Sequence, residues 1–244
     1  AQQFAKYQWS AAPMGEHIQT NDAVAPQSII NPARHTDVVG YVQEATTEQV
    51  EQALNNAQAV QDIWARTAKD TRASYLLRAA DLMEARLEEL MVLLCRESGK
   101  TYANAIAEVR EAVDFLRYYA TQMIDLDANA EVEPLGTMLC ISPWNFPLAI
   151  FTGQVAAALV AGNTVIAKPA EQTPLIAAQA IQILWQAGVP QAAVQLMPGR
   201  GETVGAQHSA AEHVQGIMFT GSTEVAKILQ KTVAKRFSQN GESI

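Results

Sequence analysis

The 244-residue sequence is 49% hydrophobic and 17% charged, which suits one large globular domain, or one domain with a helical extension. Its formal net charge of −8 and the lack of a basic run argue against nonspecific binding of nucleic acid or of an anionic lipid surface. No apolar run reaches the roughly 18 residues of a transmembrane helix, and no signal-peptide pattern opens the chain. Cys95 and Cys140, both in apolar surroundings, indicate buried thiols in a reducing compartment, so we expect a cytoplasmic protein. Because Ala1 stands where Met would begin a gene product, we expect a piece of a longer chain.

Residues 1–45 are predicted to be irregular apart from a short strand or two, because three prolines interrupt any helix. Residues 46–133 carry apolar side chains at helical spacing and are predicted to form a helical layer. We expect three helices there: one opened by a capping box of Thr46 and Gln49, one over 70–98 that stops at Gly99, and one from about Thr101.

From 134 to 244 the pattern changes to short β-rich runs that alternate with helical stretches. The runs lie at 137–142, 164–168, 193–197 and 216–219, and helical patterns follow at about 148–161, 174–187, 202–209 and after 223. This alternation is typical of βαβ units. The predicted fold class is therefore α/β: a Rossmann-like parallel sheet of at least four strands with flanking helices, preceded by the helical layer. Since ligands bind beyond the carboxyl ends of such strands, the four loops there should line one crevice.

Two of these loops have the small residues that can approach a phosphate. Gly199, Gly201 and Gly205 open a helix after a strand, but their spacing is one residue longer than the dinucleotide fingerprint, so a tight turn explains them at least as well. Gly221 and Ser222 precede another helix. Taken alone, Ser222 is better explained as a helix cap than as an anion ligand.

The other two loops carry polar side chains. Lys168 closes a strand and Glu171 follows it, and an ammonium with a carboxylate can hold a diol such as ribose. A lysine at a strand end can also simply mark the surface. Asn145 lies between Pro143 and Pro147, which stiffen its loop, so its amide could be held towards an oxyanion. A hydrogen bond from Asn145 to its own turn is an equal alternative.

Three further patterns are set aside. Residues 99–101 (Gly-Lys-Thr) match the end of a P-loop, but Leu94 stands where that motif needs glycine and a helix precedes it. Cys95 and Cys140 are expected to pack and not to react. The four histidines have no metal-ligand spacing, so no metal site is predicted.

Three motifs, PWNFP at 143–147, KPAEQTP at 168–174 and FTGSTE at 219–224, occur in the order found in the aldehyde dehydrogenase superfamily, which this chain resembles from about residue 31 onwards. That span is roughly the first half of the family's chain. Residues 99–120 more narrowly resemble the aldehyde dehydrogenase half of bifunctional proline utilisation flavoenzymes. That half oxidises L-glutamate γ-semialdehyde, the open form of Δ1-pyrroline-5-carboxylate, to L-glutamate with NAD. Its partner half, a proline dehydrogenase with FAD, would precede residue 1, and the parent would be a homo-oligomer.

The resemblance implies a role for each site residue. Asn145 would donate its amide to the oxyanion of a hemithioacetal. Lys168 and Glu171 would hold the adenosine ribose, and a carboxylate there would repel a 2′-phosphate, which favours NAD over NADP. The remaining cofactor contacts would come from Ser142, Pro143, Trp144, Gly201, Gly205, Gly221 and Ser222, and Glu111 would face the amino group of the substrate.

The sequence also departs from the family. The family's cysteine nucleophile and glutamate base lie further along, Glu242 lacks the family's Gly-Gly context, and neither Cys95 nor Cys140 matches the nucleophile. We therefore expect this polypeptide alone not to turn over. Two alternatives remain: a cofactor-binding or folding module without catalysis, and an aldehyde dehydrogenase for another semialdehyde, such as succinate semialdehyde.

Overall fold

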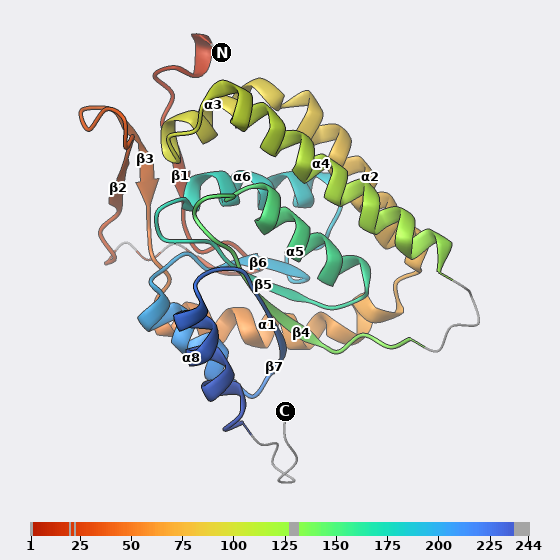
Figure 1. Cartoon of the computed structure of the whole chain (residues 1–244). Helices are drawn as coiled ribbons and strands as arrows, with labels where there is room; N and C mark the ends of the chain where they lie inside the picture. Colours follow the sequence, from red (N-terminus) through yellow and green to blue (C-terminus); the bar gives the residue numbers. More distant parts are fainter. Residues whose placement is uncertain (1, 20, 22, 127–131, 237–244) are drawn as a thin grey trace.

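The computed structural model describes residues 2–19, 21, 23–126 and 132–236 (Figure 1). Its N-terminal elements are η1 (Gln2–Phe4), β1 (Trp9–Ala11), β2 (Gln27–Ile30), β3 (Val38–Val42), α1 (Thr47–Arg66), α2 (Lys69–Ala85), α3 (Leu87–Glu97) and α4 (Tyr102–Asp125). There follow β4 (Thr137–Ile141), α5 (Ala149–Val160), β5 (Val165–Lys168), α6 (Pro174–Ala187), β6 (Val194–Leu196), the π-helical turn η2 (Gly201–Gly205), α7 (Ala206–Ala210), β7 (Val214–Phe219) and α8 (Thr223–Val233). No helix within the described ranges is long and apolar enough to cross a membrane.

The predicted α/β class is confirmed by a four-stranded, all-parallel sheet in the order β6-β5-β4-β7. Strands β4, β5 and β6 are buried at every position, as expected for parallel strands covered on both faces. A smaller sheet, β1-β3-β2, comes from the N-terminal segment. That segment also reaches the main sheet, because Met14 and Leu196 exchange two backbone hydrogen bonds at the β6 edge.

Helices cover both faces of the main sheet, so the predicted layer over 46–133 is divided. Figure 1 shows α1 below the sheet, α5 and α6 above it, and α2 to α4 as a further layer above these. The alternation of strand side chains explains the division: Leu139 and Ile166 pack with α1, whereas Cys140 and Ala167 pack in the core on the opposite face.

One helix prediction was wrong. The stretch 70–98 is two helices, α2 and α3, which meet at Arg86 with φ −102° and ψ 17°. The Arg86 side chain bonds Glu89 at 3.0 Å and Gln179 at 2.5 Å, which ties the break to α6. Because apolar side chains keep helical spacing on both sides of the break, the periodicity did not reveal it. The stretch predicted as a helix over 202–209 likewise begins as a π-helical turn, η2, before α7.

The predicted helix ends are confirmed. Thr46 and Gln49 form a reciprocal capping box on α1. Gly99, after the end of α3, has φ +70°, a left-handed value that favours glycine. Thr101 caps α4 by accepting a hydrogen bond from the Asn104 amide at 3.3 Å.

Two buried carboxylates cap the helices that follow the first two strand-end loops. Glu97 of α3 accepts hydrogen bonds from the amides of Leu175 (2.6 Å) and Ile176 (2.9 Å) in the first turn of α6. Glu108 of α4 accepts from Leu148 (2.8 Å) and Ala149 (3.3 Å) at the start of α5. Helix N-termini carry unpaired N–H groups and positive potential, so each carboxylate fixes where its crossover helix begins.

Glu97 should make the free energy of unfolding fall as the pH rises through the window between the ordinary pKa of a glutamate and about 8. Burial raises the pKa of Glu97 to about 8 from an ordinary 4.5, although two backbone amides oppose the shift. In this window the folded chain therefore holds a proton that the unfolded chain has lost, and that stabilisation vanishes as the pH passes 8, with a slope of at most about 1.4 kcal/mol per pH unit. Urea unfolding across the window measures it. Glu97→Gln should remove the slope and exposed Glu51→Gln should keep it; identical slopes would contradict the assignment.

Candidate active site

The loops after the four parallel strands line two cavities, and not the single crevice that the sequence predicted; the loop after β5 contributes to both. The first, which we term the Asn145 cavity, has a volume of about 620 Å³. It is lined by Ser142, Pro143, Trp144, Asn145, Phe146, Ile150, Ala170, Phe219, Thr220, Gly221, Ser222 and Val225. Asn145 and Ser222, which are far apart in the sequence, therefore share one cavity.

Polar groups in the Asn145 cavity are available to a ligand. Within the described ranges the Asn145 side chain makes no hydrogen bond, so the alternative in which it bonds its own turn is wrong. The Ser142 hydroxyl is buried and has no hydrogen-bond partner among the described residues. Such an orphaned group is expected where a ligand completes the hydrogen bonding. Ser222 caps α8 by accepting a hydrogen bond from the Val225 amide at 3.3 Å, which confirms the prediction that it is a helix cap.

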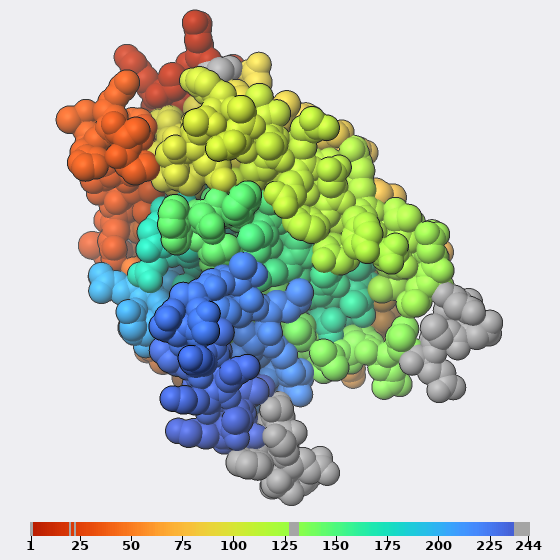
Figure 2. Space-filling model, in the orientation of Figure 1, coloured from red at the N-terminus to blue at the C-terminus, as the bar shows by residue number. Residues whose placement is uncertain are grey.

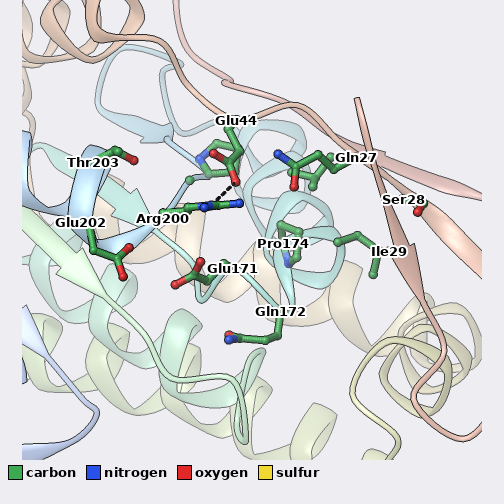
Figure 3. A pocket seen from close by; sticks show the side chains of 13 residues that line it. Gln27, Ser28, Ile29, Glu44, Glu171, Gln172, Pro174, Arg200, Glu202 and Thr203 are labelled. Atoms are coloured by element: carbon green, nitrogen blue, oxygen red, sulfur yellow. Dashed lines mark ion pairs between the residues drawn. The ribbon is translucent and has the colours of Figure 1, made fainter. Parts of the chain in front are cut away.

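The second cavity, of about 610 Å³, we term the acidic cavity (Figure 3). It is lined by Gln27, Ser28, Ile29, Val42, Glu44, Glu171, Gln172, Pro174, Pro198, Gly199, Arg200, Glu202 and Thr203. Arg200 Nε lies 3.8 Å from Glu44 Oε1, and in the view of Figure 3 Glu44, Glu171 and Glu202 lie around Arg200. Three carboxylates thus accompany one guanidinium on the walls of this cavity.

Lys168 lies buried beside the acidic cavity. Only 4% of its surface is exposed, and its ammonium donates to the Pro169 carbonyl at 3.0 Å. Burial lowers the pKa of Lys168, and attraction to Glu171, Glu44 and Glu202 opposes that shift. Lys168 also reaches η2, because a Cβ added to Gly205 would lie 3.3 Å from Lys168 Cε. Lys168, Glu171 and the glycine turn are therefore brought together.

The three glycines of the η2 loop differ. Gly199 has φ +156°, and a Cβ there would lie 2.3 Å from Val204 Cγ2, so this position serves the tight turn that the sequence offered as an alternative. A Cβ on Gly201 would meet no atom within 4 Å, so nothing in the described chain requires glycine there.

Other predicted residues lie apart from the two cavities. Glu111 is exposed on α4 and lines neither cavity, so its role stays a prediction. Cys140 is buried in β4, and burial raises the pKa of its thiol to about 12; burial also raises the pKa of Cys95. Neither is a ready thiolate at neutral pH. Glu242 and Ile244 lie outside the described residues. Within the described ranges no group of three His, Cys, Asp or Glu could hold a metal ion.

Sequence reasoning missed several residues around the site. Glu44 lines the acidic cavity from a segment that no local pattern marked, whereas Arg200 lies in the loop over 199–201 that the sequence placed at the crevice, without a role of its own. Glu108 had a usable signal, because it lies on the apolar stripe of α4 beside Ala105 and Val109 and is only 1% exposed. A charged residue on a buried helix face needs a partner, so the sequence pattern alone indicates a structural role for Glu108.

Residues 18–240 match the model of the aldehyde dehydrogenase family. This chain belongs to the aldehyde dehydrogenase family. The match covers most of the sequence and includes all three motifs from which the family resemblance was inferred.

The relatives agree on a narrower group. Over 240 residues the chain is 58% identical to the bifunctional protein PutA of Escherichia coli (strain K12), covering 98% of this chain and 18% of that protein. It is 39% identical over 233 residues to the 1-pyrroline-5-carboxylate dehydrogenase of Anoxybacillus flavithermus, covering 91% and 45%. A 1-pyrroline-5-carboxylate dehydrogenase structure from Thermus with bound NAD superposes with a TM-score of 0.90 and 34% identity, covering 96% and 48%. The chain thus spans under half of each of these relatives.

Gly205→Ala should destabilise the chain by about 1 kcal/mol relative to Gly201→Ala. Both substitutions lie in η2, so the change in backbone propensity cancels. The new methyl at 205 must displace Lys168 Cε, whose ammonium is held by Pro169, whereas the methyl at 201 meets open space. Urea unfolding of the two variants measures the difference. Equal free energies of unfolding would show that the Lys168 side chain moves aside without loss of stability.

Proposed function

We propose that the longer protein carrying this sequence oxidises L-glutamate γ-semialdehyde, from Δ1-pyrroline-5-carboxylate, to L-glutamate with NAD in proline catabolism. The observation that carries the proposal is the site itself. An unbonded Asn145 amide shares a cavity with the Ser222 loop, and a buried Lys168 with Glu171 lies at the same sheet edge. The PutA and 1-pyrroline-5-carboxylate dehydrogenase relatives supply the substrate class.

The residues present fit a dinucleotide. NAD, when bound, supplies the acceptor for hydride. The Lys168 ammonium and the Glu171 carboxylate would bond the ribose hydroxyls, since a hydroxyl both accepts and donates. The unpartnered Ser142 hydroxyl and the open surface at Gly201 give further approach to the ligand. The remaining contacts would come from Pro143, Trp144, Gly205, Gly221 and Ser222.

Asn145 would act on the aldehyde. When a thiolate adds to the aldehyde carbon, the carbonyl oxygen becomes an oxyanion, and the Asn145 amide would donate an N–H to it. A donor held in place before the reaction costs no reorganisation, because Pro143 and Pro147 restrict the loop. The thiolate would come from elsewhere in the longer protein, because Cys140 is buried with a pKa of about 12.

Further proposals follow from the PutA relatives, which are named as bifunctional. The longer protein would carry a proline dehydrogenase domain with FAD in the same chain. A homo-oligomeric parent and a cytoplasmic location stay predictions.

Turnover by the full-length protein tests the proposal. Production of NADH from glutamate semialdehyde should exceed that from succinate semialdehyde, and faster turnover of succinate semialdehyde would favour the other-semialdehyde alternative. Asn145→Ala should lower kcat on the order of 100-fold to 1,000-fold. Its affinity for NAD should stay unchanged, because the amide faces the aldehyde. An unaltered kcat would remove Asn145 from the chemistry.

Glu171→Gln should shift cofactor preference towards NADP. The 2′-phosphate of NADP would meet one carboxylate fewer, so the ratio of Kd for NADP to Kd for NAD should fall, on the order of tenfold for an exposed and screened carboxylate. The ratio is informative even if Glu171→Gln weakens both cofactors by releasing the ribose. Fluorescence titration with each cofactor measures it, and exposed Glu212→Gln, outside both cavities, is the matched control.

The second candidate, a cofactor-binding module, is favoured by the burial of Cys140. The 244-residue chain alone should show a higher Tm with NAD and produce no NADH from any aldehyde. NADH production by this chain would show that one of its own cysteines reacts, contrary to their raised pKa values.

A further inference from the structure

A buried ion pair lies directly behind the loop that carries Asn145. Glu108, 1% exposed, places Oε2 at 2.8 Å from the Lys100 ammonium, while its Oε1 accepts the two amides at the start of α5. We propose that Lys100 and Glu108 are positioning residues that hold this loop in its reactive geometry, Lys100 by binding the face of Phe146. The inference rests on the proposed function of Asn145.

Lys100 makes the contact that reaches the loop itself. Its ammonium lies 4.3 Å from the centre of the Phe146 ring, within the range of a cation–π interaction. Phe146 directly follows Asn145 in the chain. Since the Lys100 side chain is only 13% exposed, water competes weakly for the ammonium, and the interaction is stronger than at an exposed site.

The loop is thus held at two points. Glu108 bonds the backbone at Leu148 and Ala149, and Lys100 holds the side chain of Phe146. The flanking prolines limit the backbone angles between these points and β4. With one end of the loop fixed by the strand and the other by the helix cap, Trp144, Asn145 and Phe146 are the residues between the two prolines that keep rotational freedom. The Lys100 contact restrains that rotation.

Lys100 is itself held on both sides. Gly99 before it has a left-handed φ of +70°, and Thr101 after it caps α4. This turn fixes the direction from which the side chain leaves the backbone. A lysine on a mobile surface segment would lose more side-chain entropy on reaching the same place.

The two capping glutamates differ in their surroundings. Glu97 caps α6 through two amides, as Glu108 caps α5, and within the described ranges no cation pairs with Glu97. Burial raises the pKa of Glu97 to about 8, so at neutral pH it keeps its proton and needs no cation. At Glu108, the Lys100 ammonium lies 2.8 Å from Oε2 and also covers the ring of Phe146, so one side chain joins the cap of α5 to the loop of Asn145.

The first test measures the loop without relying on activity. In the full-length protein, Lys100→Met should speed amide hydrogen exchange of the peptide over 143–150, because both the ring contact and the partner of Glu108 are lost. Lys69→Met is the matched control, since Lys69 also bonds the described chain, at the Ile124 carbonyl, but lies away from the loop. Unchanged exchange over 143–150 in Lys100→Met would overturn the proposal.

The second test measures turnover of glutamate semialdehyde at saturating NAD. Lys100→Met and Phe146→Leu should each lower kcat on the order of 10-fold to 100-fold, as a misplaced amide does. Their Kd for NAD should change by a smaller factor than kcat, since Lys168 and Glu171, which would hold the ribose, lie at the acidic cavity that neither variant touches. Lys100→Arg, which keeps the charge, should recover part of kcat.

The double variant decides whether Lys100 acts through Phe146. Lys100→Met with Phe146→Leu should lose no more kcat than the worse single variant. Additive losses would overturn the link, and so would a kcat loss in Lys100→Met that Lys69→Met matches. If the unmodified protein oxidises no aldehyde, the proposed function fails, and the exchange measurement still decides the positioning claim.

Discussion

The amide groups that open α5 and α6 find their hydrogen-bond partners in a different layer of the molecule. Glu108 of α4 accepts hydrogen bonds from the first amides of α5, and Glu97 of α3 accepts them from the first amides of α6. Each of these helices begins where a strand-end loop finishes, so the carboxylates determine where the PWNFP and KPAEQTP loops stop. Because a buried N–H or a buried side-chain oxygen without a hydrogen-bond partner is costly, α5 and α6 cannot shift without α3 and α4 shifting with them. The layer of α2, α3 and α4 therefore fixes the geometry of the site, although the walls of the two cavities come from other segments.

Sequence reasoning succeeded where the information was local. Strand and helix alternation, the capping box of Thr46 and Gln49, and the convergence of four loops at one sheet edge all follow from short-range patterns. It failed at Arg86, where the chain breaks between α2 and α3 and the Arg86 side chain bonds Gln179 in α6. It could not find Glu44, which reaches the acidic cavity because the following residue, Ala45, bonds the Pro198 carbonyl at 2.8 Å. Such contacts join segments that no window of sequence compares.

The N-terminal segment, predicted only as irregular chain with a strand or two, forms part of the wall of the acidic cavity. Met14 extends the β6 edge through two backbone hydrogen bonds, and β2 supplies one wall of the acidic cavity. The cavity therefore unites residues from the first fifth of the chain with loops after β5 and β6. Glu44, Glu171 and Glu202 all contribute negative potential near Lys168. The electrostatic potential in the cavity therefore depends on the tertiary structure and not on one local motif.

The C-terminal pair of elements, β7 and α8, contributes few buried side chains in the described part of the chain. Strand β7 is an edge strand that pairs only with β4, and α8 has no buried residue; Figure 2 shows the blue C-terminal segment on the outside of the molecule. Ile228 is 62% exposed and Val225 is 42% exposed. Local opening takes the lowest free energy where the fewest apolar contacts are broken. Ser222 stands at the junction of β7 and α8. A dinucleotide bound there would hold these two elements together, so binding would slow their local opening.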